Sequence, residues 1–160
     1  MYFWKVRTGR ERYVSLADTI QKMGMQVYDS LDYADKYLPY NVTPKEIFHI
    51  LKQNTTYKHD PQGVELLQSM PSLMDDNYWG HSGWGDCDCF TIAGVACCTV
   101  RGYKTRYVVV GNSKNAPSHI YFQVHDGRRW VDFDLVAPYY GITKPYKYQN
   151  SFPIIEKQLY

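Results

Sequence analysis

Hydrophobic residues in the first quarter of the chain recur with a roughly helical period. Between residues 14 and 38 the apolar positions could form one face of a helix, but Gly24 interrupts the series. This pattern predicts two short helices that pack on the core of the protein.

A sharper helix signal follows at Thr43-Pro44-Lys45-Glu46. Thr43 can accept a hydrogen bond at the helix start, Pro44 suits the first helical position, and Glu46 completes a capping box. Apolar residues at positions 47, 50 and 51 then form one apolar face of the helix. The helix is predicted to end near residue 55 or 56.

The next two segments differ strongly in composition. Residues 57–85 hold four glycines and two prolines around one short apolar run, which predicts mainly loop with a helical turn. Residues 87–100, CDCFTIAGVACCTV, are small and apolar throughout and are followed by Arg101-Gly102. Because glycine readily ends a helix, this segment is predicted to be a buried helix.

The last third of the chain has the composition of strands. Residues 107–110, 119–124 and 130–134 are rich in β-branched and aromatic side chains, and Asp126-Gly127 is a tight-turn signal between the last two. The sequence therefore predicts an α+β protein with at least three antiparallel strands. Prolines then break every pattern, leaving a wrapping tail with one short strand at 154–155.

The chain has 160 residues, the usual size of one domain. We expect a single domain over 1–160, with an N-terminal helical part at 1–42, a catalytic core at 43–136 and the wrapping tail at 137–160.

Charge and hydropathy exclude several classes of function. Eighteen basic and sixteen acidic residues leave a net charge of +2, without the like-charge runs of a nucleic-acid or membrane-surface protein. The opening MYFWKVRTGRER turns charged too soon for a signal peptide, and no apolar stretch is long enough to span a membrane. These features predict a cytoplasmic protein, with neither nucleic-acid binding nor membrane insertion.

All four cysteines lie close together, at positions 87, 89, 97 and 98. Such clustering is a poor framework for disulfides between distant segments, so we interpret them as reduced thiols. Their spacing also matches no common structural zinc site, and we expect neither a metal nor a cofactor.

Cys87 stands out because it begins the predicted buried helix, after Gly-Trp-Gly-Asp. A helix N-terminus stabilises negative charge, which favours thiolate over thiol, and the N–H groups of the first turn could also stabilise an oxyanion. Cys87 is therefore the candidate nucleophile.

A nucleophilic thiol needs a base, and the base needs an orienting acid. His119 opens one predicted strand and Asp134 closes the next. Counted outward from Asp126-Gly127, the two residues are equally distant from the turn, so hairpin pairing would place them nearly opposite each other.

Other residues compete for these roles. Cys89 is in the same first turn but points about 200° away around the helix. Asp132 shares a strand face with Asp134 and is the alternative orienting acid. His81 precedes Cys87 on a glycine-rich loop, although a loop histidine is usually just solvated.

Four segments together carry a resemblance to a known family: GDCDCF at 85–90, Gly102-x-x-x-Arg106, SHIYFQV at 118–124 and RWVDFD at 129–134. In this order they resemble the transglutaminase-like superfamily of papain-type thiol enzymes, over about residues 43–136. The upstream stretch YKHDPQGVELLQSMPSLM is similar to a small subgroup encoded by bacteriophages and prophages.

The resemblance implies a papain/transglutaminase-like core with Cys87 as nucleophile, His119 as general base, Asp134 as orienting acid and Trp130 as packing. It departs from the family pattern at Gln123, where many relatives are acidic, and at Cys89, which replaces a frequent Asp. The implied activity is acyl transfer from a peptide or carboxamide through a thioester, by a cysteine peptidase, an amidase or a transglutaminase.

A protein of another class would explain the sixteen tyrosines and four tryptophans. Exposed aromatic residues mark contacts with proteins or sugars. The alternative is a non-catalytic binding or assembly protein of the same fold, associated with a phage virion.

Overall fold

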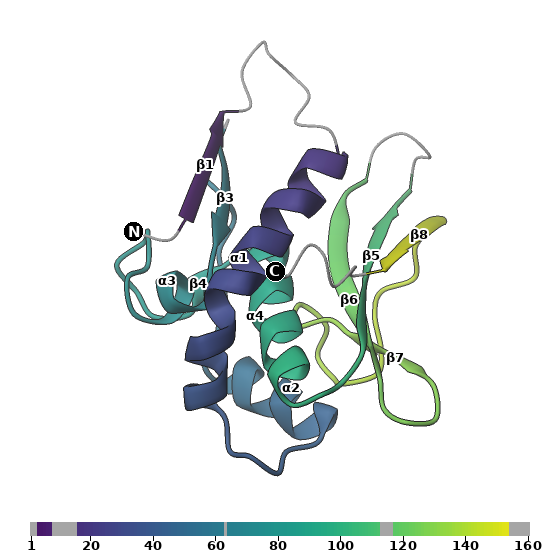
Figure 1. The fold of residues 1–160 in the computed structure, drawn as a ribbon. Coiled ribbons are helices and arrows are strands. Elements are labelled where there is room, and N and C mark those ends of the chain that lie inside the picture. Colours follow the sequence, from purple (N-terminus) through teal and green to yellow (C-terminus); the bar gives the residue numbers. More distant parts are fainter. Residues whose placement is uncertain (1–2, 8–15, 63, 113–116, 154–160) are drawn as a thin grey trace.

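The computed structural model describes residues 3–7, 16–62, 64–112 and 117–153 of the chain. The protein is α+β, with helices beside an antiparallel sheet (Figure 1). The helices are α1 Leu16–Tyr37, α2 Pro44–Gln53, α3 Met70–Met74 and α4 Cys87–Val100. The strands are β1 Phe3–Arg7, β2 Thr56–Tyr57, β3 Val64–Gln68, β4 Trp84–Gly85, β5 Thr105–Gly111, β6 His119–His125, β7 Trp130–Phe133 and β8 Tyr148–Pro153.

The main sheet has the strand order β7-β6-β5-β8, and every neighbouring pair is antiparallel. This confirms the predicted antiparallel sheet. The strand expected at 154–155 lies outside the described residues, but the segment just before it, β8, pairs with β5 as the fourth strand. Two smaller pairs complete the strands: β1 with β3, and a short parallel pair of β2 with β4.

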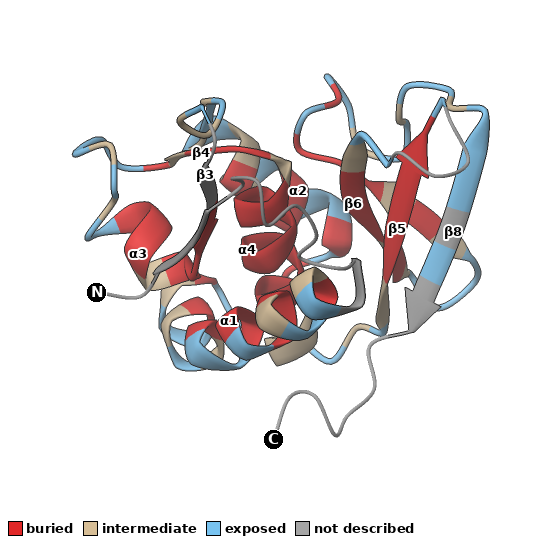
Figure 2. Cartoon of the chain, turned by 90° about the horizontal axis from the view of Figure 1, so that it is seen from above, coloured by how far each residue is buried: buried red, intermediate tan, exposed pale blue. Residues whose placement is uncertain are grey.

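Helix α4 lies in the middle of the molecule, between the β1–β3 pair and the main sheet, with α1 alongside (Figures 1 and 2). Its sequence is apolar on all sides because every side packs against protein. Gly94 permits the close approach to the sheet, since a Cβ there would lie only 2.3 Å from the ring of Phe122. The predicted buried helix at 87–100 is confirmed.

In the first half of the chain one prediction is wrong and another is incomplete. Residues 16–37 form one continuous helix through Gly24, because the packing of Met23, Val27 and Ala34 in the core outweighs the helix penalty of about 1 kcal/mol for one glycine. The segment 57–85 is mainly loop with one short helix, α3, as predicted, but its apolar run is strand β3 rather than part of a loop.

The capping box at Thr43 is confirmed. The Glu46 N–H donates to Thr43 Oγ1 over 3.2 Å, and the Thr43 N–H donates to Glu46 Oε1 over 3.3 Å. The helix ends at Gln53 with Asn54 as its C-cap, slightly earlier than predicted. Within the part of the chain that the structure describes, no helix combines the length and apolarity needed to cross a membrane.

The β6–β7 hairpin has a different register from the predicted one. Four residues, 126–129, connect the strands, because the Asp126 carboxylate accepts the N–H groups of Arg128 and Arg129 at 2.8 and 2.9 Å. The last registered pair is therefore Phe122 with Phe133. Asp134 lies just beyond β7 and does not sit opposite His119.

Arg101 joins the end of α4 to the end of α1. Its side chain is only 5% exposed, and it donates to the Asp35 carboxylate over 2.6 Å and to the backbone carbonyls of Asp35, Leu38 and Pro39. We expect Arg101→Met to lower the free energy of unfolding by about 2–3 kcal/mol, because it leaves these acceptors without their donor. Urea denaturation measures the change.

Lys36 provides the matched control. Its ion pair with Asp32 on α1 spans 3.0 Å, but the two side chains are 77% and 86% exposed. Lys36→Met should therefore change stability by no more than about 0.5 kcal/mol. Equal losses in the two variants would contradict the structural role assigned to Arg101.

Candidate active site

The backbone before Cys87 is hydrogen-bonded to the segment that follows α2, through the parallel pair of β2 and β4. The Thr56 N–H donates to the Gly83 carbonyl over 2.9 Å, and the Lys58 N–H donates to the Gly85 carbonyl over 2.7 Å. Gly83 has a φ of +81°, and a Cβ there would lie 2.0 Å from the Asn54 carbonyl oxygen. Only glycine fits at this position, so the turn that delivers Cys87 is specified by sequence.

Cys87 is the first residue of α4, and Asp86 is its N-cap. Strand β7 pairs with β6 only at residues 122–125, so the beginning of β6 has an open edge. Helix α4 occupies this edge: the Ile120 N–H forms a hydrogen bond with the Cys87 sulfur, and the Ile120 carbonyl accepts the Thr91 hydroxyl over 3.4 Å. Cys87 is therefore fixed beside the residue that follows His119.

His119 and Asp134 are joined by a hydrogen bond of 2.8 Å between Nε2 and Oδ2. Their side chains are 10% and 5% exposed. The carboxylate also accepts the Thr143 hydroxyl over 2.7 Å and the Val136 N–H over 3.1 Å. Since the carboxylate accepts from Nε2, that nitrogen carries the proton and Nδ1 is left as the basic nitrogen.

The His119 ring is also held by aromatic contacts. It is stacked with Tyr121 and Tyr146, with both ring centroids 5.8 Å away. Tyr121 belongs to the small cluster on the sheet face opposite α4, whereas Ile120 belongs to the main core. His119, two residues from Tyr121, shares its face.

Cys87 thus has to meet His119 around the edge of the sheet rather than through it. The pKa of the Tyr146 hydroxyl is consistent with this arrangement. Burial raises its pKa first, and the charges of Asp134 and Cys87 raise it further, so both groups lie near this hydroxyl. The site is built at the open edge of β6, where the beginning of α4 and the chain after β7 come together.

The Cys87 thiol is not poised as a thiolate. Burial raises its pKa well above the ordinary value of 9.0, the neighbouring Asp88 and Asp86 carboxylates raise it further, and the Ile120 N–H opposes them. The direction of this shift is opposite to the predicted effect of the helix N-terminus, which favours thiolate. Desolvation and the two nearby negative charges both favour the neutral thiol.

We expect Asp88→Asn to speed alkylation of Cys87 by iodoacetamide at neutral pH. Removing one negative charge lowers the thiol pKa toward 9.0, which increases the thiolate fraction at any pH below it. The measurement is the alkylation rate against pH, with Asp32→Asn as an exposed control on α1. A slower rate in Asp88→Asn would contradict this electrostatic account.

Among the described residues, Asp132 reaches the His119 ring only through Tyr121, whose hydroxyl forms a hydrogen bond with Asp132 and whose ring stacks on His119. Its carboxylate accepts the Gln123 side-chain N–H over 2.9 Å, and Gln123 accepts the Arg106 Nε–H over 2.8 Å. The Arg106 guanidinium lies 4.2 Å from the centre of the Trp130 ring. Gln123 thus bridges a cation and an anion, and Trp130, expected as packing, also supports Arg106.

The remaining candidates are placed away from this chemistry. Cys89 is fully buried, with its thiol donating to the Leu66 carbonyl over 3.3 Å, and Cys97 and Cys98 are buried in the core. His81 is exposed and stacks on Trp84, with centroids 4.1 Å apart. Across the described residues, no three His, Cys, Asp or Glu side chains gather where a metal ion could bind.

Sequence reasoning missed Thr143 and Tyr146. Both lie in the tail at 137–160, which has no regular period and was predicted only to wrap the surface. Their contacts with Asp134 and His119 arise from tertiary structure. No local sequence pattern marks them.

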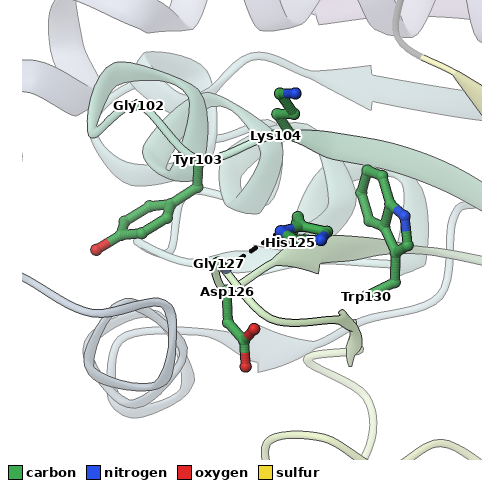
Figure 3. A pocket seen from close by; sticks show the side chains of 7 residues that line it. All are labelled: Gly102, Tyr103, Lys104, His125, Asp126, Gly127 and Trp130. Atoms are coloured by element: carbon green, nitrogen blue, oxygen red, sulfur yellow. Dashed lines mark hydrogen bonds between the residues drawn. The ribbon is translucent and has the colours of Figure 1, made fainter.

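A pocket of about 480 Å³ lies at the other end of β6, about 20 Å along the strand from His119. Figure 3 shows the rings of Tyr103, His125 and Trp130 around it, with Lys104 above. The Gly127 N–H donates to His125 Nδ1 over 3.1 Å. This pocket contains none of the three predicted catalytic residues.

Comparison with known proteins gives little to add. No family model and no curated protein matches the chain. Among solved structures, a candidate cysteine protease from Cytophaga hutchinsonii is similar, with a TM-score of 0.38 and 14% identity over 83% of this chain and 48% of that one. This chain thus spans about half the length of that protein.

Proposed function

We propose that the chain is a thiol-dependent acyl-transfer enzyme with a transglutaminase-like core, acting as a cysteine peptidase or amidase. Cys87 is the nucleophile, His119 the general base and Asp134 the orienting acid. The observation that carries the proposal is the His119–Asp134 hydrogen bond of 2.8 Å, which leaves Nδ1 of a buried imidazole as a base. Cys87 is held beside the adjoining Ile120 N–H.

The raised pKa of Cys87 determines the order of events. The resting thiol is protonated, so His119 Nδ1 removes its proton as the sulfur attacks the substrate carbonyl. The Ile120 N–H stabilises the sulfur as its negative charge develops. Asp134 stabilises the imidazolium and keeps the ring in one orientation.

Attack of the sulfur on the carbonyl gives a tetrahedral intermediate, which then releases the amine. His119 gives its proton to the leaving nitrogen, the C–N bond breaks, and the acyl group stays on Cys87 as a thioester. Water attacks the thioester in hydrolysis, whereas a lysine amine would attack in transamidation. Hydrolysis is the simpler proposal, because no feature of the described residues marks a second site for an amine.

The non-catalytic alternative also has an observation in its favour. The same burial and carboxylates that raise the Cys87 pKa would suit an inert thiol. Exposed tyrosines, including Tyr40 and Tyr139, could serve binding to another protein. In this alternative the chain is an assembly protein, and association with a phage virion stays a prediction.

Incubation with a mixed peptide library, followed by mass spectrometry of the products, separates the two functions. The enzyme should generate new peptide termini, and folded Cys87→Ala protein should generate none. Absence of products with the wild-type chain, across peptide and carboxamide substrates, would favour the binding protein.

A further inference from the structure

We propose that the pocket beside His119 binds the leaving group of the substrate, and that this group is an apolar amino acid with a free carboxylate. The inference rests on the proposed acyl-transfer function and names its substrate class. The pocket has a volume of about 320 Å³ and is formed largely by the chain that follows β7.

The position of the pocket identifies the part of the substrate. His119 lines it, and Cys87 does not. Because His119 donates its proton to the departing nitrogen, the atoms attached to that nitrogen must lie next to the imidazole. The acyl group, which bonds to sulfur, extends in another direction. The pocket is therefore on the leaving-group side.

The lining of the pocket favours an apolar side chain. Val136, Ala137, Pro138 and Ile142 form its wall, and Val136 and Ile142 are 44% and 46% exposed without a ligand. A ligand that covers these side chains gains about 25 cal/mol for each Å² of apolar surface removed from water. A branched aliphatic residue such as leucine matches this surface.

Lys144 supplies the recognition of charge. Among the described residues that line the pocket, it alone carries a permanent positive charge. The negative charge of Asp134 is already engaged by His119, and Asp134 also accepts the Thr143 hydroxyl and the Val136 N–H. The free ammonium therefore favours a carboxylate at the pocket mouth.

These contacts describe cleavage at the carboxyl end of a peptide. The Cys87 sulfur bonds to the carbonyl carbon, the amide C–N bond breaks, and His119 delivers the former thiol proton to the nitrogen. The released amino acid leaves with its carboxylate beside Lys144. Water then hydrolyses the thioester and restores the thiol, so the overall reaction consumes one water for each peptide bond.

Two alkylating probes test the inference without a known substrate: N-bromoacetyl-leucine and N-bromoacetyl-leucinamide. They differ only in the terminal carboxylate. In each, the deprotonated Cys87 sulfur displaces bromide from the methylene carbon of the bromoacetyl group, so the whole probe stays attached to the protein. Wild-type protein should react about fivefold faster with the carboxylate probe, as expected for an exposed ion pair. Because Lys144 is exposed, added salt should reduce the preference.

Lys144→Met should bring the ratio of the two rates close to one. Lys147→Met is the matched control, because it removes the same charge from the same segment but does not line the pocket. It should keep the wild-type ratio. Equal rates for the two probes in wild-type protein, or an equal effect of both lysine variants, would overturn the inference while leaving the proposed function intact. Failure of both probes to modify Cys87 would overturn both proposals.

Discussion

Replacing Cys87 by alanine should abolish acyl transfer, because no other described thiol can take its place. Cys89 is two residues away on α4, but it is fully buried and bonded to the Leu66 carbonyl, on the side facing β3. The loss should therefore be complete within the sensitivity of the assay, whereas loss of a supporting group leaves residual activity.

The measurement is the rate of peptide cleavage by variants whose fold is verified by circular dichroism and thermal unfolding. Cys89→Ser is the matched control. It should retain catalysis while losing stability, since it places a more polar group in an apolar site. Activity that persists in Cys87→Ala and disappears in Cys89→Ser would reassign the nucleophile.

Replacing Asp134 by asparagine should reduce kcat by about 10²- to 10⁴-fold, as expected when a catalytic histidine loses its orienting carboxylate. Asp134 accepts three donors, from His119, Thr143 and Val136. In Asp134→Asn, one carboxylate oxygen is replaced by an NH2 group. This group is itself a donor and cannot accept a hydrogen bond from His119, Thr143 or Val136. The imidazole would then move its proton to Nδ1 to accept at Nε2, and Nδ1 would no longer be a base.

Asp132→Asn is the control for this experiment. Asp132 interacts with Gln123 and Tyr121, whereas Asp134 accepts directly from His119, so the loss of Asp132 should reduce kcat far less than the loss of Asp134. Steady-state kinetics of both variants, with their melting temperatures, separate the two roles. Equal losses of kcat at unchanged melting temperature would mean that Asp132 shares the orienting role.

The elements predicted well from sequence are those whose signals are local. Thr43, Pro44 and Glu46 stand next to one another and complete their cap within a single turn. The segment 87–100 is apolar enough to identify a buried helix from composition alone. The sequence predicts an element correctly where the interacting residues lie within four positions of each other, or where one unbroken segment has a uniform composition.

Elements that depend on distant partners were not predicted. Strand β1 pairs with β3 about sixty residues later, and each segment alone is short. Gly24 interrupts the apolar period in the sequence, but the core packing of α1 keeps the helix continuous. The hairpin register depends on the side chain of Asp126, which lengthens the turn and shifts the pairing.

The candidate site shows the same division. Cys87, His119 and Asp134 stand out through neighbouring motifs, but the counting argument for opposing positions was wrong because of the hairpin register. Asp134 reaches His119 from just beyond the end of β7. The pKa of Cys87 depends on burial in the folded chain, which no helix-start motif reveals.

The most direct test of the central claim is to identify the residue that becomes acylated. Wild-type protein, Cys87→Ala and His119→Gln are mixed briefly with p-nitrophenyl acetate, quenched in acid and mapped by peptide mass spectrometry. We predict one acetyl group on Cys87 of the wild type, which disappears as water hydrolyses the thioester, and greatly slowed acetylation in His119→Gln. Acetylation at another residue, or at Cys87 with an unchanged rate in His119→Gln, would contradict the account.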